Sequence, residues 1–233
     1  MLQIEKTVLP SPEQWEIIIE GMRNPLNSWD KSDSLCAYDG EFILGENDHD
    51  LMMQLAKGGA VHAKYRRMIP VYFTVTSSFY FFKELDTYKI GTVCNSCSTM
   101  HKIHSKPIEL SDFSVDDFYM NDFRIGFQDM FADVVADCET LRVNFLTYAE
   151  KAKKEDCFTE AERKHFSRQA KRFWKGLIQL LPSSYNQKRT YMVNYEVLHN
   201  IYHSRKNHKL DEWHTLCDWI RGLPYSELIT GGE

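Results

Sequence analysis

The most informative stretch of the chain is TYMVNYEVLHNIYHSRKNHKLDEW, residues 190–213. We predict a helix over Tyr191–Arg205, because at about 100° per residue one face collects Asn194, Val197, Leu198, Ile201, Arg205 and His208. Burying an unpaired guanidinium is costly, so Arg205 needs an anionic partner. Two alternatives remain open for this partner. One is an internal ion pair, with Glu212 or a distant acid, and the other is a bound phosphate or ionised base.

Predicted helices flank this stretch on both sides. One is expected over residues 210–221, and apolar residues with three-and-four spacing run through residues 114–181. A break at Phe158–Thr159 divides the longer run, and Thr159 with Glu162 matches the capping box that starts a new helix. The C-terminal half is therefore predicted to be mainly helical.

The strongest strand signal lies further upstream, in IPVYFTVT, residues 69–76. This run is rich in β-branched and aromatic residues and predicts a buried strand. Ser77 or Ser78 is expected to cap a helix to about Lys89. The small and polar residues 91–99 that follow predict a loop.

The N-terminal region predicts two helices joined by a long loop. The first covers residues 11–22, with a serine cap followed by proline, and the turn-forming residues 22–34 predict the loop. Asn47 or Asp48 caps a second, short helix that ends before Gly58–Gly59.

These elements define one helix-rich α/β (α+β) domain over residues 1–233, with a small central sheet and flanking helices. A mainly helical insertion is expected at about residues 112–181.

Composition excludes several other classes of protein. The 233 residues are 43% apolar and 26% charged, with a net charge of −5, which is typical of a globular protein and disfavours a broad nucleic-acid binder. No apolar run approaches the roughly 20 residues that cross a bilayer, so no membrane partner is expected. MLQIEKTVLP at the start lacks the order of a signal peptide, which predicts a cytoplasmic protein whose six cysteines are reduced.

A cysteine-rich segment, residues 86–104, allows several kinds of chemistry. Cys94-x-x-Cys97 followed by two histidines suggests zinc, but the spacing is far more compact than in a zinc finger. A redox pair is a second alternative. A third is a phosphate cradle of backbone N–H groups over Asn95–Thr99, with Lys89 supplying charge. The fourth is a turn with buried thiols.

A basic segment, GGAVHAKYRRMIP at residues 58–70, precedes the predicted strand. Its cations are either a solvated strand entry or part of an anion site, and they include Arg66 and Arg67. The sequence contains no Walker motif, GxGxxG, nucleophile elbow or HExxH, and we expect no metal site.

The layout of these segments resembles the flavin-dependent thymidylate synthases, over roughly residues 40–105 and 175–225. In that family, Leu-Pro is followed by a helix with an Asn and then an Arg eleven residues on, as in Leu181-Pro182, Asn194 and Arg205 here. The family motif RHRxxSxNExSxRY falls on residues 87–100, where it is eroded. Only Lys89 and Thr92 are close replacements, with Cys97 in place of a serine, and Ile178 stands where the family has an arginine.

The resemblance implies a homotetramer that binds FAD and converts dUMP to dTMP, with methylenetetrahydrofolate as carbon donor and NADPH as reductant. Arg205 is then the catalytic residue, holding the uracil. Cys97, Ser98 and Thr99 meet the nucleotide phosphate. The cofactor-binding residues are Lys89, Asn95, Asn194, His208, Arg66 and Arg67.

Other functions remain open beside this one. They are a related modification of a pyrimidine nucleotide, such as hydroxymethyl transfer, and a nucleotide-binding protein without turnover. A helical interaction protein that uses residues 112–181 as its partner surface is a further alternative. Cys97 also raises the alternative of thiolate addition to C6 of a pyrimidine.

Overall fold

The computed structural model describes residues 2–116 and 125–232. The chain divides into two compact units, which we describe separately. The hairpin unit consists of Ser77–Phe82 and Ser96–Lys188, and the α7 unit consists of Leu2–Thr76, Lys83–Asn95 and Arg189–Glu233. A single domain with a helical insertion at 112–181 stays a prediction.

A four-stranded sheet has the order β1-β4-β6-β5, with β1 (Gln3–Val8), β4 (Pro70–Ser78), β6 (Asn186–Asn194) and β5 (Val93–Ser96). β1 runs antiparallel to β4, with Gln3 opposite Thr76 and an irregularity at Lys6, whose φ is +46°. Along β4, alternate residues Val71, Phe73 and Val75 are buried, as the period of two for a strand requires.

The helices of the α7 unit enclose a core rich in aromatic residues. They are α1 (Pro12–Arg23), α2 (Glu46–Lys57), α7 (Tyr195–Arg205), α8 (Asp211–Arg221) and α9 (Glu227–Thr230). Short 3-10 turns η1 (Asn24–Leu26), η2 (Trp29–Lys31) and η3 (Ala63–Met68), and the strand pair β2 (Leu35–Cys36) and β3 (Phe42–Ile43), join them. The fully buried side chains of this unit include Trp213, Tyr191 and Tyr195.

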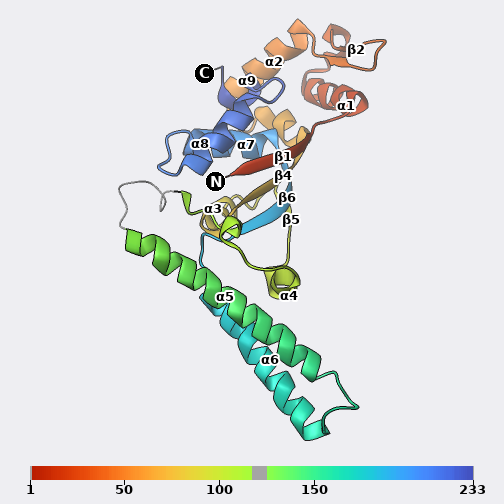
Figure 1. Ribbon diagram of the computed structural model, residues 1–233. Coiled ribbons are helices and arrows are strands. Elements are labelled where there is room, and N and C mark those ends of the chain that lie inside the picture. The colour runs from red at the N-terminus through yellow and green to blue at the C-terminus, as the bar shows by residue number, and fades with distance from the viewer. Residues whose placement is uncertain (1, 117–124, 233) are drawn as a thin grey trace. The chain divides into compact units, whose positions relative to one another are not determined.

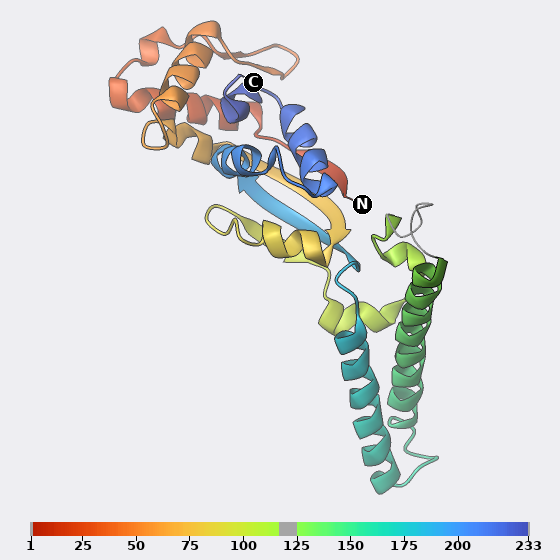
Figure 2. The same cartoon turned by 90° about the vertical axis from the view of Figure 1, so that its left-hand side faces the viewer.

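Two long antiparallel helices dominate the hairpin unit, α5 (Ile125–Lys151) and α6 (Glu160–Leu180), which lie side by side in Figures 1 and 2. Thr159 caps α6 in the predicted capping box with Glu162. Buried Cys138 and Leu177 lie in a core with Ile103 and Phe113. Part of the predicted helical run, residues 117–124, lies outside the described residues.

The hairpin unit also contains short elements: α4 (Thr99–Lys102), η4 (Ile103–Ser105) and η5 (Leu110–Asp112). α3 (Phe79–Leu85) begins in this unit and ends in the α7 unit.

The local signals at several helix ends are confirmed. Ser11 forms a capping box with Gln14 at the start of α1, and Pro12 is its first residue. The strand predicted at 69–76 is present as β4, and the helix predicted at 210–221 is present as α8.

Three predicted elements differ from the structure in type or extent. The helix predicted to begin at Tyr191 begins at Tyr195, because Asn186–Asn194 pair in the sheet as β6. Residues 91–99 are not all loop, because Val93–Ser96 form β5 at the sheet edge. The helix predicted to reach Lys89 ends at Leu85, although Ser78 does accept a hydrogen bond from the Phe81 N–H (3.4 Å).

Candidate functional site

Arg205, the last residue of α7, is held by two side chains from the segment at the end of α3. Its Nε donates to the Tyr88 hydroxyl (3.0 Å), and its Nη1 donates to Glu84 Oε2 (3.1 Å). The guanidinium carbon lies 4.7 Å from the centroid of the Trp213 ring, in cation–π geometry. Within residues 2–116 and 125–232, Arg205 Nη2 has no hydrogen-bond partner. The side chain is therefore fixed in direction and retains one donor group.

Glu84 is the acceptor that joins this cluster. Its Oε2 also accepts a hydrogen bond from Trp213 Nε1 (2.8 Å) and lies 3.4 Å from His208 Nε2. The Leu210 N–H donates to His208 Nδ1 (3.1 Å), so Nε2 carries the ring proton and faces Glu84. Of the two partners left open for Arg205, the internal ion pair is present, with distant Glu84 as the acid.

Arg205 and Glu84 are only partly buried. Their side chains are 21% and 35% exposed, and an ion pair at such a site contributes little stability because water screens it. The Arg205–Glu84 pair can therefore exchange a partner with a ligand at modest cost.

Asn194 is the N-cap of α7, where its Oδ1 accepts from the Val197 N–H (3.0 Å). Gly91, with a φ of +79°, packs against this cap so closely that a Cβ there would lie 3.1 Å from Asn194 Nδ2. The Asn194 side chain thus starts the helix that carries Arg205 and ties it to the loop before β5. Its contact with a cofactor stays a prediction.

The other residues predicted to bind the cofactor divide into two groups. Lys89, Asn95 and Arg67 are exposed. Arg66 is 3% exposed, and its Nη1 lies 3.8 Å from Glu196 Oε2 on α7. Glu196 precedes Arg205 by nine residues, which at about 100° each puts the two on opposite faces of the helix. Arg66 and Arg205 therefore do not share one side of α7.

Cys97, Ser98 and Thr99 belong to the hairpin unit, whereas the other seven predicted site residues belong to the α7 unit. The Cys97 N–H donates to the Lys188 carbonyl (2.9 Å), and the Cys97 carbonyl accepts from Gln187 Nε2 (2.5 Å). Ser98 Oγ accepts from the His101 N–H (3.1 Å) and caps α4, which Thr99 begins. The backbone of this stretch is thus held on β6, with the Cys97 side chain exposed.

The alternatives based on the cysteines gain no support. Across the part of the chain that the structure describes, no three His, Cys, Asp or Glu side chains lie close enough to hold a metal ion. All six cysteines are free thiols, and Cys94 and Cys97 are exposed instead of buried. A search of the described helices for one that is long and apolar enough to span a membrane found none.

The sequence did not indicate three residues of the Arg205 cluster as part of a site: Glu84, Tyr88 and Trp213. Glu84 and Tyr88 are four residues apart, which is the spacing of side chains on one helical face. That spacing was visible in the sequence, but nothing in it connected the pair to Arg205, 117 residues after Tyr88.

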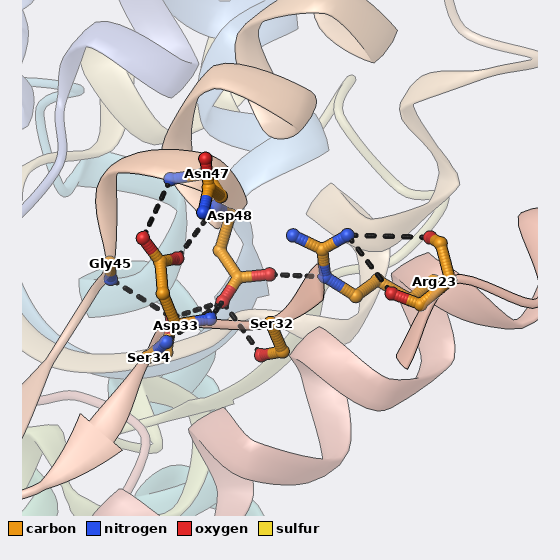
Figure 3. Close-up of polar contacts among 8 residues, drawn as sticks. Arg23, Ser32, Asp33, Ser34, Gly45, Asn47 and Asp48 are labelled. Carbon is orange, nitrogen blue, oxygen red and sulfur yellow. Dashed lines mark hydrogen bonds and ion pairs between the residues drawn. The ribbon is translucent and has the colours of Figure 1, made fainter. Parts of the chain in front are cut away.

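A second arginine–carboxylate cluster lies elsewhere in the α7 unit, where α1, α2 and the loop between η2 and β2 meet. Asp48 is fully buried, and its Oδ1 accepts from Arg23 Nε at 2.5 Å. Its Oδ2 accepts from the hydroxyls of Ser32 (2.8 Å) and Ser34 (2.6 Å), and from the N–H groups of Asp33 and Ser34. Figure 3 shows Asp48 between Arg23 and these loop residues.

Asp48 is therefore a structural anion and not a helix cap. Burial by itself raises the pKa of the Asp48 carboxyl, but hydrogen bonds from Ser34, Ser32 and Arg23 outweigh burial and lower it. The prediction that Asn47 or Asp48 caps α2 is wrong. Asp33 does so instead, because its carboxylate accepts from the N–H groups of both residues (3.0 and 3.2 Å).

Comparison with known proteins identifies the class of fold. No protein-family model matches the sequence, and no curated protein matches it significantly. Among solved structures, the chain is similar to the flavin-dependent thymidylate synthase ThyX from Helicobacter pylori in complex with FAD and dUMP. The match has a TM-score of 0.60 and 18% identity, over 99% of this chain and 98% of that one.

A second Helicobacter pylori ThyX structure with FAD and dUMP matches with a TM-score of 0.61 and 17% identity, over 99% of this chain and 97% of that one. The chain therefore has the fold of the flavin-dependent thymidylate synthases. The helix-rich α+β class with a small sheet, expected from the sequence, is confirmed.

Proposed function

We propose that this chain is an FAD-dependent enzyme of the thymidylate synthase type, which methylates dUMP reductively to dTMP. Methylenetetrahydrofolate is the carbon donor and NADPH the reductant. The fold shared with ThyX over 99% of the chain supports the class. The single observation that carries the proposal is Arg205, which is held by Tyr88 and Glu84 with one donor group unused.

Arg205 binds the uracil in this proposal. Its Nη2 donates to a carbonyl oxygen of the base, and its charge stabilises negative charge that develops on the ring when C5 becomes nucleophilic. The anchoring contacts to Tyr88 and Glu84 hold the guanidinium in position before the substrate arrives, so little reorganisation is needed during the reaction. Trp213 adds a flat apolar surface beneath the guanidinium.

The chemistry of the available donors fits FAD in part. Exposed Lys89 and Arg67 have no ion-pair partner among the described residues, and with Asn95 they suit the anionic phosphates of the cofactor. Asn194 and Arg66 already have partners in the fold, so their contribution to FAD is to hold α7 in place. FAD supplies the redox chemistry when bound, and the protein supplies position and electrostatic field.

The nucleotide phosphate is assigned to Cys97, Ser98 and Thr99. Their backbone is fixed on β6 and at the start of α4, which favours hydrogen bonds to an anion. The Ser98 hydroxyl can donate while its oxygen continues to cap the helix. We further propose a cytoplasmic homotetramer.

The experiment that tests the proposal is an absorbance spectrum of the purified protein, with and without added FAD and dUMP. We expect a bound-flavin spectrum that dUMP perturbs. The gene should rescue a thymidine-requiring strain, and Arg205→Ala should abolish rescue while Lys57→Ala, at an exposed position at the end of α2, leaves it intact. A protein that ignores excess FAD and dUMP refutes the proposal.

A related modification of a pyrimidine nucleotide is the second candidate. The observation that favours it is Glu84, a carboxylate within hydrogen-bonding distance of Arg205 that reduces the net positive charge offered to the base. FAD binding without rescue by a soluble, well-expressed protein supports this candidate over thymidylate synthesis.

A further inference from the structure

A cavity of about 500 Å³ lies in the α7 unit beside Asp48. None of the residues that line it belongs to the Arg205 cluster. Its walls come from α1, η2 and β3, and its floor from the serines that bind Asp48. The volume is within the range of small-molecule sites, which is about 300–1,000 Å³.

The floor of the cavity carries no net charge. Arg23 and Asp48 neutralise each other in the contact shown in Figure 3, and both are buried. Arg23 Nη1 donates to Ser28. Nη2 has no hydrogen-bond partner among the described residues, but it is shielded from solvent, and Asp48 offsets the charge of the guanidinium. The Ser32 and Ser34 hydroxyls, which line the cavity, both donate to Asp48, and Ser34 Oγ also accepts from the Gly45 N–H (3.0 Å).

Two carboxylates on the rim of the cavity are left without a counter-charge. Glu16 and Glu20 are four residues apart on α1 and therefore project from one face of the helix. Among the described residues, no Lys, Arg or His forms an ion pair with either one, and the partner of Glu16 is the thiol of Cys36 (3.1 Å). Hydrogen bonding to Glu16 raises the pKa of Cys36, so this thiol stays neutral. The cavity thus carries about two negative charges.

The remaining walls are flat and apolar. Trp29 is 50% exposed, yet its indole is fixed because Nε1 donates to Asn24 Oδ1 (2.8 Å). The Phe42 ring is fixed as well, stacked on Trp15 with centroids 5.4 Å apart and planes at 7°. Rigid aromatic surfaces beside unpaired carboxylates attract cations, because the negative face of the ring and the carboxylates act in the same direction.

We propose that this cavity binds an organic cation, an amine or guanidinium attached to an aromatic or hydrocarbon body. The charged group pairs with Glu16 and Glu20, and the body lies between Trp29 and Phe42. The unpaired carboxylates exclude nucleotides, phosphates and carboxylates by repulsion. This cavity is separate from the proposed flavin and nucleotide site. The proposal of a cation site therefore stands even if the chain is not a flavin-dependent enzyme.

Isothermal titration of the full chain with a matched set of probes tests the site. Benzylamine is the cation, benzyl alcohol its neutral analogue and benzoate its anionic analogue, and agmatine provides a guanidinium on a hydrocarbon chain. We expect benzylamine and agmatine to bind, and benzyl alcohol to bind at least fivefold more weakly than benzylamine. Benzoate should not bind.

Exposed side chains provide variants that leave the fold intact. Glu20→Gln should weaken benzylamine about fivefold. Glu16→Gln with Glu20→Gln should weaken it further, but by less than about 25-fold, because the two carboxylates share one cation and their effects do not add independently. Trp29→Leu should weaken it about threefold. Glu46→Gln removes one exposed carboxylate from α2 outside the cavity lining and is the control, with an expected change below twofold.

Three results overturn the proposal. They are no binding by either cation, equal binding of benzyl alcohol and benzylamine, and equal affinity of the Glu16→Gln/Glu20→Gln variant and the unaltered chain. The thermal unfolding midpoint of each variant, compared with that of the unaltered chain, separates loss of binding from loss of fold.

Discussion

Two of the arginine–carboxylate pairs in the α7 unit differ in almost every physical respect. Arg23 and Asp48 are 3% and 0% exposed, and four further hydrogen bonds converge on the carboxylate. Arg205 and Glu84 are 21% and 35% exposed, 3.1 Å apart, and Arg205 has a donor to spare. The Asp48 carboxylate of the first pair accepts five hydrogen bonds and holds a loop to two helices, although Arg23 Nη2 is buried without a hydrogen-bond partner among the described residues. The second is partly open to solvent, and it leaves one donor group of Arg205 without a partner among the described residues.

The largest effect is expected from Asp48→Ala. The change leaves Arg23 buried without its anion and four donors without their acceptor, which costs about 3–5 kcal/mol of unfolding free energy. Urea unfolding followed by circular dichroism measures this cost. A loss below about 1 kcal/mol contradicts the view that this pair is structural.

Arg205→Ala is expected to lower stability little and turnover strongly, in contrast to Asp48→Ala. Its unfolding free energy should change by about 1 kcal/mol or less, because the pair is partly exposed. Under the proposed function, turnover of dUMP should fall about 10²–10³-fold, as when one preorganised donor is removed from a reaction centre. Urea unfolding and single-turnover kinetics on the same preparation separate the two quantities. A large loss of stability with turnover intact would show that Arg205–Glu84 is a structural pair and not part of the reaction centre.

The pH dependence of stability should follow Asp48. Its folded-state pKa is lowered, so it contributes stability above its unfolded pKa, near 3.9, and this contribution is lost as pH falls through the lower folded value. Urea midpoints measured from pH 6 to pH 2.5 should therefore fall more steeply below about pH 4 in the unaltered chain than in Asp48→Asn. Parallel curves for the two proteins exclude this role for Asp48.

Glu84→Gln should have the smallest effect on stability. The amide oxygen still accepts from Trp213 and Arg205, so the loss should stay below about 1 kcal/mol. Glu84→Ala removes the acceptor that the buried Trp213 Nε1 uses, which costs about 1–3 kcal/mol. Urea unfolding of the two variants checks the difference. Equal losses show that the charge of Glu84, and not its acceptor oxygen, stabilises the cluster.

Local signals in the sequence were sufficient for much of the fold. The caps at Ser11 and Thr159 were predictable because each capping box is formed by residues three positions apart. The strand β6 was not predictable, because Tyr191, Met192 and Val193 suit either a helix or a strand. Pairing with distant strands in the sheet makes this segment a strand. β5 was missed because a polar, exposed edge strand lacks an apolar pattern.

The candidate site was predictable only in part, for a related reason. Arg205 stood out as a charge on an apolar stripe, and the burial expected of that stripe predicted an anionic partner. The identity of that anion did not follow, because Glu84 and Arg205 are 121 residues apart and meet only through tertiary structure. The same holds for Asp48, whose partners come from α1 and from the loop before β2.

The long interval between β4 and β6 has a consequence for the order of folding. Thr74 and Thr190 bond across these strands, 116 residues apart (2.9 Å), so their pairing closes a very long loop. α5 and α6 lie inside that loop and meet through a short turn, which lets them associate early. Their association shortens the effective loop before the strands pair, and each halving of loop length saves about 0.6 kcal/mol of closure entropy. The hairpin is thereby expected to act as a kinetic scaffold, whose weakening slows refolding more than it speeds unfolding.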